Sequence, residues 1–376
     1  MQTKKLRVKK QKNPSNRSKT FAVFLLFTLP DFIPPQITHW KNMKILNGKD
    51  EASIAEAVRL LENGEIVAFP TETVYGLGAV AVNPYAVAKI FEVKKRPHFD
   101  PLIVHLADAQ RLDEYVEEIP TEAEKLIKLF WPGPLTMIFR KRPLIPGIVT
   151  AGLPTVGIRV PSHPVALELI RRLGKPIAAP SANEFGYMSP TRVHHVARSF
   201  AERVPLVLDG GSSQHGIEST IISFHDDGVF VHRHGAIPVE ELSEHVRIME
   251  AEKTSATCEA PGELPYHYSP MKPLRLVNNP GDAKDRNSSY LAFKEPDPYP
   301  DAKHIRVLSP AGDLREAASN FFSYLIELDR DDIDVIYAEK VPEKGIGRAI
   351  MERLRKASKR HARPVPEAII ENLDHP

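Results

Sequence analysis

Short apolar segments that alternate with amphipathic stretches place the strongest constraint on the fold of this chain. The apolar segments are three to five residues long, and they occupy 65–69, 102–105, 135–139, 156–160, 177–179, 206–208, 219–222 and 229–232. Helical periodicity separates several of them, at 50–63, from Asn83 onward, and at 121–130, 164–173 and 191–201. Asp50 and Asn83 are the predicted amino-terminal caps of the first two helices. This alternation predicts an α/β domain that ends near residue 248.

A second, smaller α/β unit is predicted beyond a linker. The linker is poor in large aliphatic residues and contains several prolines. Beyond it, apolar segments at 274–277, 304–308 and 335–337 alternate with helical stretches at 314–328 and 349–359. We therefore divide the 376 residues into an extension (1–42), a first domain (43–248), the linker (249–273) and a carboxy-terminal α/β domain (274–376).

The first 42 residues are expected to lie outside the fold. Six basic residues fall within positions 1–12, and an apolar run follows at 21–27. This order resembles the start of a signal peptide, but the run is short and no small-x-small cleavage site follows it. The run also falls well below the roughly 20 residues that span a bilayer. We predict a fresh start at Met43, with a targeting peptide as the alternative.

Charge and cysteine content narrow the class of protein. There are 50 Lys and Arg against 48 Asp and Glu, so the chain beyond its basic amino-terminal end is slightly acidic. Such a balance does not predict a nucleic-acid-binding surface. The single cysteine, Cys258, excludes an internal disulfide and a cysteine-based zinc cluster. We expect a cytoplasmic protein that does not associate with a membrane.

Three local patterns have competing explanations. The stretch 76–81 matches the loose dinucleotide-binding pattern, but that pattern joins a strand directly to a helix, and here the helix begins only after Asn83. His232 and His234 could share a metal ion, although the lack of a third ligand nearby favours a surface pair. The glycine-rich stretch 210–216 fits either an anion-binding loop or an ordinary turn.

Polar motifs that follow the apolar segments indicate a functional site. Hydroxyl and carboxylate groups at 71–73 follow one segment, and Ser181 and Asn183 follow another. Lys94 and Arg96 lie at the end of the second predicted helix. Each motif alone has a structural explanation, since hydroxyls and Asn cap helices and basic runs are usually solvated. Their joint occurrence favours a site at the strand ends, where α/β proteins bind ligands.

Eight motifs in a fixed order give the chain a resemblance to a known family. They are Phe69–Gly78, Lys94-x-Arg96-Pro97, Pro101–His105, Trp131–Thr136, Val149–Gly152, Arg159–Pro161, Ala179–Asn183 and Gly216–Thr220. In this order they closely resemble the YrdC-like threonylcarbamoyl-adenylate synthases. Tyr266–Pro270 and Gly345–Ile350 resemble the two-domain version, and the resemblance spans 43–376. Two residues depart from the usual pattern: Asp100 replaces Asn, and Ser269 replaces Ala.

The resemblance implies both a fold and a reaction. The fold is a YrdC-like twisted mixed sheet with a concave active site, followed by a smaller Rossmann-like α/β domain. The reaction converts L-threonine, bicarbonate or carbon dioxide, and ATP into L-threonylcarbamoyl-adenylate and pyrophosphate, with Mg²⁺ accompanying the ATP. The product would feed N6-threonylcarbamoyladenosine formation in tRNA. The downstream transferase machinery is therefore an expected partner, and tRNA itself is a further candidate.

The matched motifs also imply roles for individual residues. Negative charge accumulates when a threonine carbamate attacks the α-phosphate, and Lys94 and Arg96 are expected to stabilise it. Ser181 and Asn183 complete a polar tetrad with these two cations. The residues implied for threonine are Thr73, His105, Arg159, Ala179 and Ser219, with Arg159 pairing with the carboxylate. Those implied for ATP are Arg96, Asp100, Thr155, Ser181, Ser189, Arg233 and Tyr268. No side chain is identified as a metal ligand.

Other functions are less consistent with the sequence. A nucleic-acid-binding module of the same fold needs only dispersed positive charge, whereas the synthase needs the whole tetrad, which is present. A segment of a larger hydrogenase-maturation protein is disfavoured, because the chain lacks zinc-finger cysteines and an acylphosphatase-like segment. The aromatic residues at 266–268 further predict that the linker covers the site, with Tyr268 reaching the nucleotide.

Overall fold

The computed structural model describes residues 43–249, 261 and 267–359. The expected extension at 1–42 and most of the linker lie outside the described residues. The helices and strands, in chain order, are β1 (Lys44–Asn47), α1 (Glu51–Glu62), β2 (Val67–Phe69), β3 (Gly76–Val80), α2 (Pro84–Lys94), β4 (Ile103–His105), α3 (Thr121–Phe130), β5 (Leu135–Arg140), β6 (Thr155–Arg159), α4 (Pro164–Leu173), β7 (Ile177–Ala178), α5 (Val193–Phe200), β8 (Leu206–Asp209), β9 (Thr220–His225), β10 (Gly228–Arg233), α6 (Val239–Ser243), β11 (Ile248–Met249), β12 (Leu274–Val277), β13 (Ser288–Ala292), β14 (His304–Val307), α7 (Leu314–Leu328), β15 (Val335–Glu339) and α8 (Gly347–Lys359).

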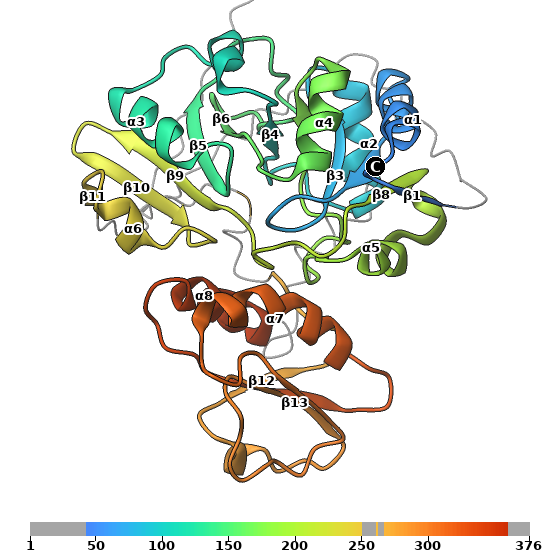
Figure 1. Cartoon of the computed structure of the whole chain (residues 1–376), viewed down its shortest axis with the longest axis vertical. Coiled ribbons are helices and arrows are strands. Elements are labelled where there is room, and N and C mark those ends of the chain that lie inside the picture. The colour runs from blue at the N-terminus through green and yellow to red at the C-terminus, as the bar shows by residue number, and fades with distance from the viewer. Residues whose placement is uncertain (1–42, 250–260, 262–266, 360–376) are drawn as a thin grey trace, which may run out of the picture. The chain divides into compact units, whose positions relative to one another are not determined.

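A mixed β-sheet forms the centre of the first domain, as expected. Its strand order is β1-β8-β2-β3-β7-β4-β6-β5-β9-β10-β11. The sheet contains both parallel pairs, such as β4 with β6, and antiparallel pairs, such as β5 with β6. Helices α1 and α4 pack together against one part of the sheet, while α2, α3 and α5 contribute to a separate apolar cluster (Figure 1). None of the described helices is long and apolar enough to cross a bilayer.

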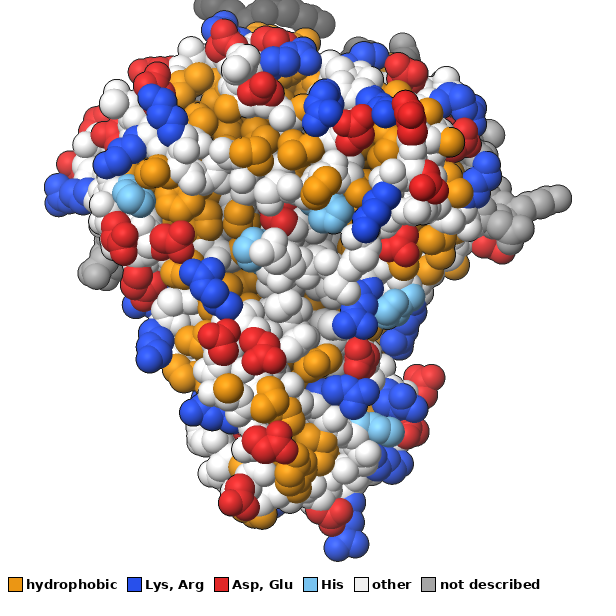
Figure 2. All heavy atoms as spheres, in the orientation of Figure 1, with side chains coloured by type: hydrophobic (Ala, Val, Ile, Leu, Met, Phe, Trp, Pro, Cys, Tyr) orange, Lys and Arg blue, Asp and Glu red, His pale blue; other side chains and the backbone are white. Residues whose placement is uncertain are grey.

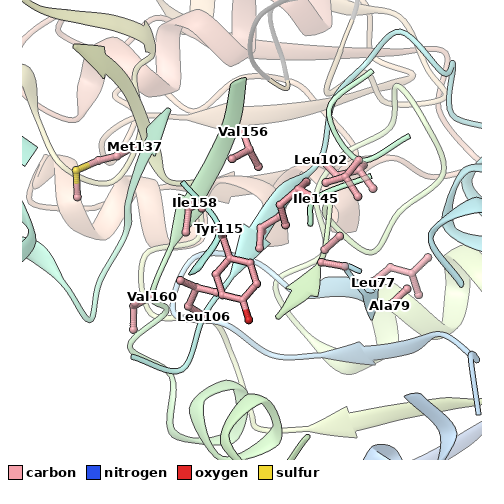
Figure 3. Close-up of a cluster of buried hydrophobic side chains, with 14 of the residues drawn as sticks. Leu77, Ala79, Leu102, Leu106, Tyr115, Met137, Ile145, Val156, Ile158 and Val160 are labelled. Atoms are coloured by element: carbon pink, nitrogen blue, oxygen red, sulfur yellow. The ribbon is translucent and has the colours of Figure 1, made fainter. Parts of the chain in front are cut away.

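Side-chain alternation along the strands decides which face of the sheet can hold polar groups. Val104, Val156 and Ile158 belong to the apolar cluster that α2 and α3 help to form, part of which Figure 3 shows. Because successive side chains of a strand point to opposite faces, His105 and Arg159 must point away from this cluster. The core therefore fills one face of β4 and β6, and their opposite face carries polar side chains.

Strand β3 was not predicted from the sequence, where its glycines resembled a nucleotide-binding pattern. It pairs antiparallel with β2, so Gly78 lies in the sheet and not in a loop before a helix. A Cβ atom on Gly78 would lie 2.6 Å from the side chains of both Ile177 and Phe69. Close packing of neighbouring strands thus explains this glycine, and the dinucleotide interpretation is rejected.

Substituting Gly78 with Ala is expected to lower the free energy of unfolding by about 1–3 kcal/mol, because the added methyl overpacks the core. Urea denaturation would measure the change. Gly147→Ala is the matched control, since a Cβ atom there meets nothing within 4 Å. Equal stability of the two variants would contradict the packing explanation.

The second domain has a four-stranded parallel sheet with the order β12-β15-β13-β14. Helices α7 and α8 lie on the same face of this sheet (Figure 1). Their apolar side chains form a cluster that also includes Val74, Met188 and Ile217 of the first domain. The two domains therefore share buried apolar surface, and this shared surface lies beside the predicted site residues.

Candidate active site

A cavity on the polar face of the first sheet brings together nine of the predicted site residues. Several occupy strand ends: His105 ends β4, Arg159 ends β6, and Arg233 ends β10. The nine residues that line the cavity are Thr73, Arg96, His105, Arg159, Ala179, Ser181, Ser219, Arg233 and Tyr268. The structure thus gathers residues from eight motifs or loops into one small volume that is rich in cations and hydroxyls.

Arg159 is held by four hydrogen bonds at one end of the cavity. Its Nε donates to His105 Nε2 (2.8 Å), and its Nη1 donates to Glu72 Oε1 (3.1 Å) and Thr73 Oγ1 (3.0 Å). Its Nη2 donates to Thr71 Oγ1 (3.3 Å). Since guanidinium has five N–H donors, one N–H of Nη2 has no acceptor among the described residues. Glu72, which had no assigned role in the sequence, is the ion-pair partner that fixes Arg159.

His105 is a neutral hydrogen-bond acceptor toward Arg159. Because an arginine Nε can only donate, His105 Nε2 must be unprotonated, and the ring proton lies on Nδ1, which faces the Ile103 carbonyl at 3.2 Å. Burial, followed by the charge of Arg159, lowers the pKa of His105 well below its ordinary value. The pair therefore keeps one tautomer and one orientation at the cavity wall.

Lys94 is buried directly behind the cavity wall. Its Nζ donates to the carbonyl oxygen of Ser181 at 2.6 Å and to that of Asn183. Asn183 in turn donates through Nδ2 to the carbonyls of Glu184 (2.7 Å) and Tyr187 (2.9 Å). Burial, and secondarily the charge of Arg96, lowers the pKa of Lys94 well below its ordinary value. Within the tetrad, Lys94 therefore contacts Ser181 and Asn183 through their backbone oxygens. It also holds the loop that carries Ser181.

Arg96 lines the cavity and is oriented by a buried carboxylate. Its Nη2 lies 2.9 Å from Asp100 Oδ2 and donates to the Pro101 carbonyl at 2.8 Å. Asp100 is fully buried and contacts Arg96 instead of lining the cavity. Of the other residues implied for ATP, Thr155 lines a smaller hollow that shares Ile103 with the main cavity.

The cavity also contains a carboxylate that was not among the predicted residues. Glu218 lines the cavity, and its Oε1 accepts a hydrogen bond from the Ser189 hydroxyl at 2.5 Å. This contact accounts for Ser189, which does not line the cavity itself. Arg233 donates to the carbonyl and the hydroxyl of Ser219 at 3.0 and 3.1 Å, so two predicted residues hold each other in place.

Tyr268 belongs to the linker that is predicted to cover the site, and it is among the residues that the structure describes. It is buried, lines the cavity and has a left-handed φ of 63°, which is unusual for a bulky residue. Residues 250–260 and 262–266, on which the remainder of that prediction depends, lie outside the described residues.

The described residues do not form a metal centre. Within 43–249, 261 and 267–359, no group of three or more His, Cys, Asp or Glu side chains could hold a metal ion. His232 is buried, and its Nε2 lies 2.8 Å from the Ser223 hydroxyl, so its description as part of a surface pair is wrong. In the glycine-rich loop, the Tyr75 hydroxyl donates to the Gly211 carbonyl at 2.7 Å, which supports a structural role for that turn.

Comparisons with known proteins show which family the two domains resemble. Residues 59–235 match the family described as "Telomere recombination", whose label groups Sua5, YciO and YrdC proteins, and residues 237–359 match "Threonylcarbamoyl-AMP synthase, C-terminal domain". A threonylcarbamoyl-AMP synthase of Pyrococcus abyssi is 42% identical over 327 residues, covering 82% of this chain and 95% of the relative. One from Bacillus subtilis is 39% identical, with 82% and 94% covered. The crystal structure of Pyrococcus abyssi Sua5 with L-threonine gives a TM-score of 0.77 at 41% identity, covering 84% of this chain and 98% of that chain.

Proposed function

The chain belongs to the two-domain, YrdC-like threonylcarbamoyl-AMP synthase family, and from this premise we propose that it makes L-threonylcarbamoyl-adenylate and pyrophosphate from L-threonine, bicarbonate and ATP. The observation that carries the proposal is the single cavity in which an anchored Arg159 and the cations Arg96 and Arg233 converge. A reaction between an amino acid and a nucleotide needs both kinds of group within one enclosed site.

We propose that threonine binds at the Arg159 end of the cavity. The remaining Nη2 N–H of Arg159 supports a charge-assisted hydrogen bond to the carboxylate, and a single bond is all that the held guanidinium can offer there. Thr73 and the neutral ring of His105 add polar groups beside it. Because Arg159 is already anchored in the protein, its side chain loses little conformational entropy when the amino acid binds.

We propose that Arg96 and Arg233 face the phosphates of ATP. The carbamate oxygen attacks the α-phosphorus, the bond to the bridging oxygen breaks, and pyrophosphate leaves with the added negative charge. Both guanidinium groups are fixed by carbonyl and hydroxyl acceptors, so they are oriented before the charge develops. No protein nucleophile is needed for this displacement.

Mg²⁺ is proposed to accompany ATP, bound through phosphate oxygens. The carboxylate that lines the cavity, Glu218, is already paired with Arg353, so the described side chains do not fit a site that holds the ion through protein ligands.

The product is proposed to supply a tRNA-modifying transferase with an activated threonylcarbamoyl group for N6-threonylcarbamoyladenosine. The structure gives less support to an RNA-binding module as the main function. Acidic and basic side chains of the described residues are interspersed on the face that Figure 2 shows, without a broad basic area. An electrostatic footprint for RNA would concentrate positive charge.

The purified protein is expected to release pyrophosphate from ATP only when threonine and bicarbonate are both present. Mass spectrometry after incubation with labelled threonine should detect labelled threonylcarbamoyl-adenylate. Serine and valine serve as matched amino-acid controls, because each lacks one feature of the threonine side chain. Equal pyrophosphate release without threonine would reject the proposed function.

A further inference from the structure

Arg353 of α8 is a fully buried cation at the boundary of the two domains. Its Nε donates to Glu218 Oε2 at 2.6 Å, and its Nη2 lies 2.6 Å from the same oxygen. Its Nη1 donates to the carbonyls of His234 (3.0 Å) and Ala349 (2.9 Å). With 0% of its surface exposed, this side chain is bound entirely by the protein.

Two side chains that Arg353 contacts line the active-site cavity. Glu218 is one of them. The other is Tyr268, whose ring centroid lies 5.2 Å from the Arg353 guanidinium carbon and 5.6 Å from the ring of Phe322 of α7. The ring of Tyr268 therefore contacts one residue of α8 and one residue of α7. The second domain therefore supports two groups of a cavity that is built on the first domain.

An ionised Glu218 without a positively charged partner would make the cavity unfavourable for an anionic ligand. Burial raises the pKa of Glu218, but the charges of Arg353 and Arg233 outweigh burial and hold that pKa at about 2. The carboxylate is consequently ionised at neutral pH. An unpaired negative charge beside a site for a polyphosphate would repel the ligand, because such interactions are poorly screened in a buried site.

We propose that Arg353 is a positioning residue for the synthase reaction: it neutralises Glu218 and holds Tyr268, so that the cavity accepts the anionic phosphate chain of the nucleotide. This inference rests on the proposed function for the identity of the anion. It assigns to the second domain an electrostatic contribution to the active site in addition to the shared apolar surface.

Removing either charge of the Arg353–Glu218 ion pair separately distinguishes the positioning role of Arg353 from a merely structural role. Arg353→Met leaves a buried carboxylate in the cavity and is expected to raise the KM for ATP by about tenfold or more. The KM for threonine should change less, because the amino acid is a zwitterion with no net charge. Glu218→Gln removes the negative charge and leaves the cation, so the KM for ATP should not rise.

The double variant E218Q/R353M provides the decisive measurement. It has neither charge, so the electrostatic repulsion is removed and only the support of Tyr268 is lost, and its KM for ATP is expected to return to within about threefold of the wild-type value. Arg355→Met is the matched control, because Arg355 lies on the same helix, is half exposed and pairs with Glu343. Circular dichroism and thermal unfolding would verify that each variant is folded.

Each outcome either supports or overturns the inference. Equal increases in the KM for ATP in Arg353→Met and Glu218→Gln would show that the pair is only structural. If Arg353→Met does not fold, a tenfold increase in the folded double variant would also overturn the proposal. Calorimetric titration of ATP into the same variants gives the same comparison without turnover. A wild-type protein that binds ATP but makes no adenylate would therefore reject the proposed function and leave this test intact.

Discussion

Replacing Lys94 or Arg96 with alanine is expected to lower the synthase rate by on the order of a hundredfold or more. Arg96 lines the cavity and is oriented by Asp100 and by the Pro101 carbonyl, so its removal takes away a cation that is already in position. Steady-state release of pyrophosphate at saturating substrate would measure the loss.

The two variants should lose activity for different reasons. Lys94→Ala leaves the carbonyl oxygens of Ser181 and Asn183 without their buried donor, which costs about 1–3 kcal/mol for each group and loosens the loop. We therefore expect Lys94→Ala to lower thermal stability as well as the rate. Arg96→Ala should lower the rate because it removes a cation that lines the cavity, and it should lower stability as well because it takes away the guanidinium that pairs with the fully buried Asp100.

Lys95→Asn is the matched control for both variants. Lys95 lies between the two residues, is exposed, and has a left-handed φ of 52° that Asn tolerates. It removes one positive charge of the same motif without touching the cavity, so the rate should stay near that of the wild type. Wild-type rates in Lys94→Ala and Arg96→Ala would place the chemistry elsewhere.

The elements that the sequence predicted well have strong local signals. Helices α3 and α4 match the expected ranges, because proline and clear apolar periodicity define their starts and faces. Asn83 caps α2 as expected, accepting from the backbone N–H groups of Tyr85 and Ala86. Asp50 precedes α1, but its carboxylate accepts a hydrogen bond from Asn47 and makes no side-chain cap bond. The hydrogen bond with the Asn47 side chain thus takes the place of the expected cap bond to the helix backbone.

Two strands that the sequence did not reveal begin with residues of low β-propensity. Strand β3 begins Gly-Leu-Gly, and β13 begins Ser-Ser, so neither carries the usual propensity signal. Their positions are fixed by neighbours that are distant in sequence: Gly78 pairs with Val67, and Ser288 pairs with Val335. Tertiary packing decides these strands, and local pattern cannot show it.

The same distinction between local sequence signals and long-range contacts applies to the candidate site. Short motifs identified the residues that line the cavity, because most of these motifs lie within a few residues of a strand end. The motifs could not identify the partners that hold those residues. Glu218 and Arg353 are separated by 135 positions, and Glu72 and Arg159 by 87. Only the fold shows that each cation of these pairs has a buried carboxylate as its counterpart.

The pairing of Glu72 with Arg159 sharpens the expected effect of Arg159→Leu. The variant loses the N–H that we assign to the threonine carboxylate, and the KM for threonine should rise by roughly tenfold to a hundredfold. The value of kcat should change much less, because a carboxylate contact acts equally on the ground state and the transition state. Initial rates over a range of threonine concentrations would measure both constants.

A loss of stability must be separated from a loss of binding in this variant. Arg159→Leu leaves Glu72 buried without its partner, which is expected to cost about 3–5 kcal/mol of folding free energy. The double variant E72Q/R159L removes that charge and should recover much of the stability, while the KM for threonine stays high. Arg171→Leu, at an exposed position of α4, is the control for the loss of a surface arginine. A folded E72Q/R159L protein with the wild-type KM for threonine would show that Arg159 only supports the cavity wall and does not bind the carboxylate.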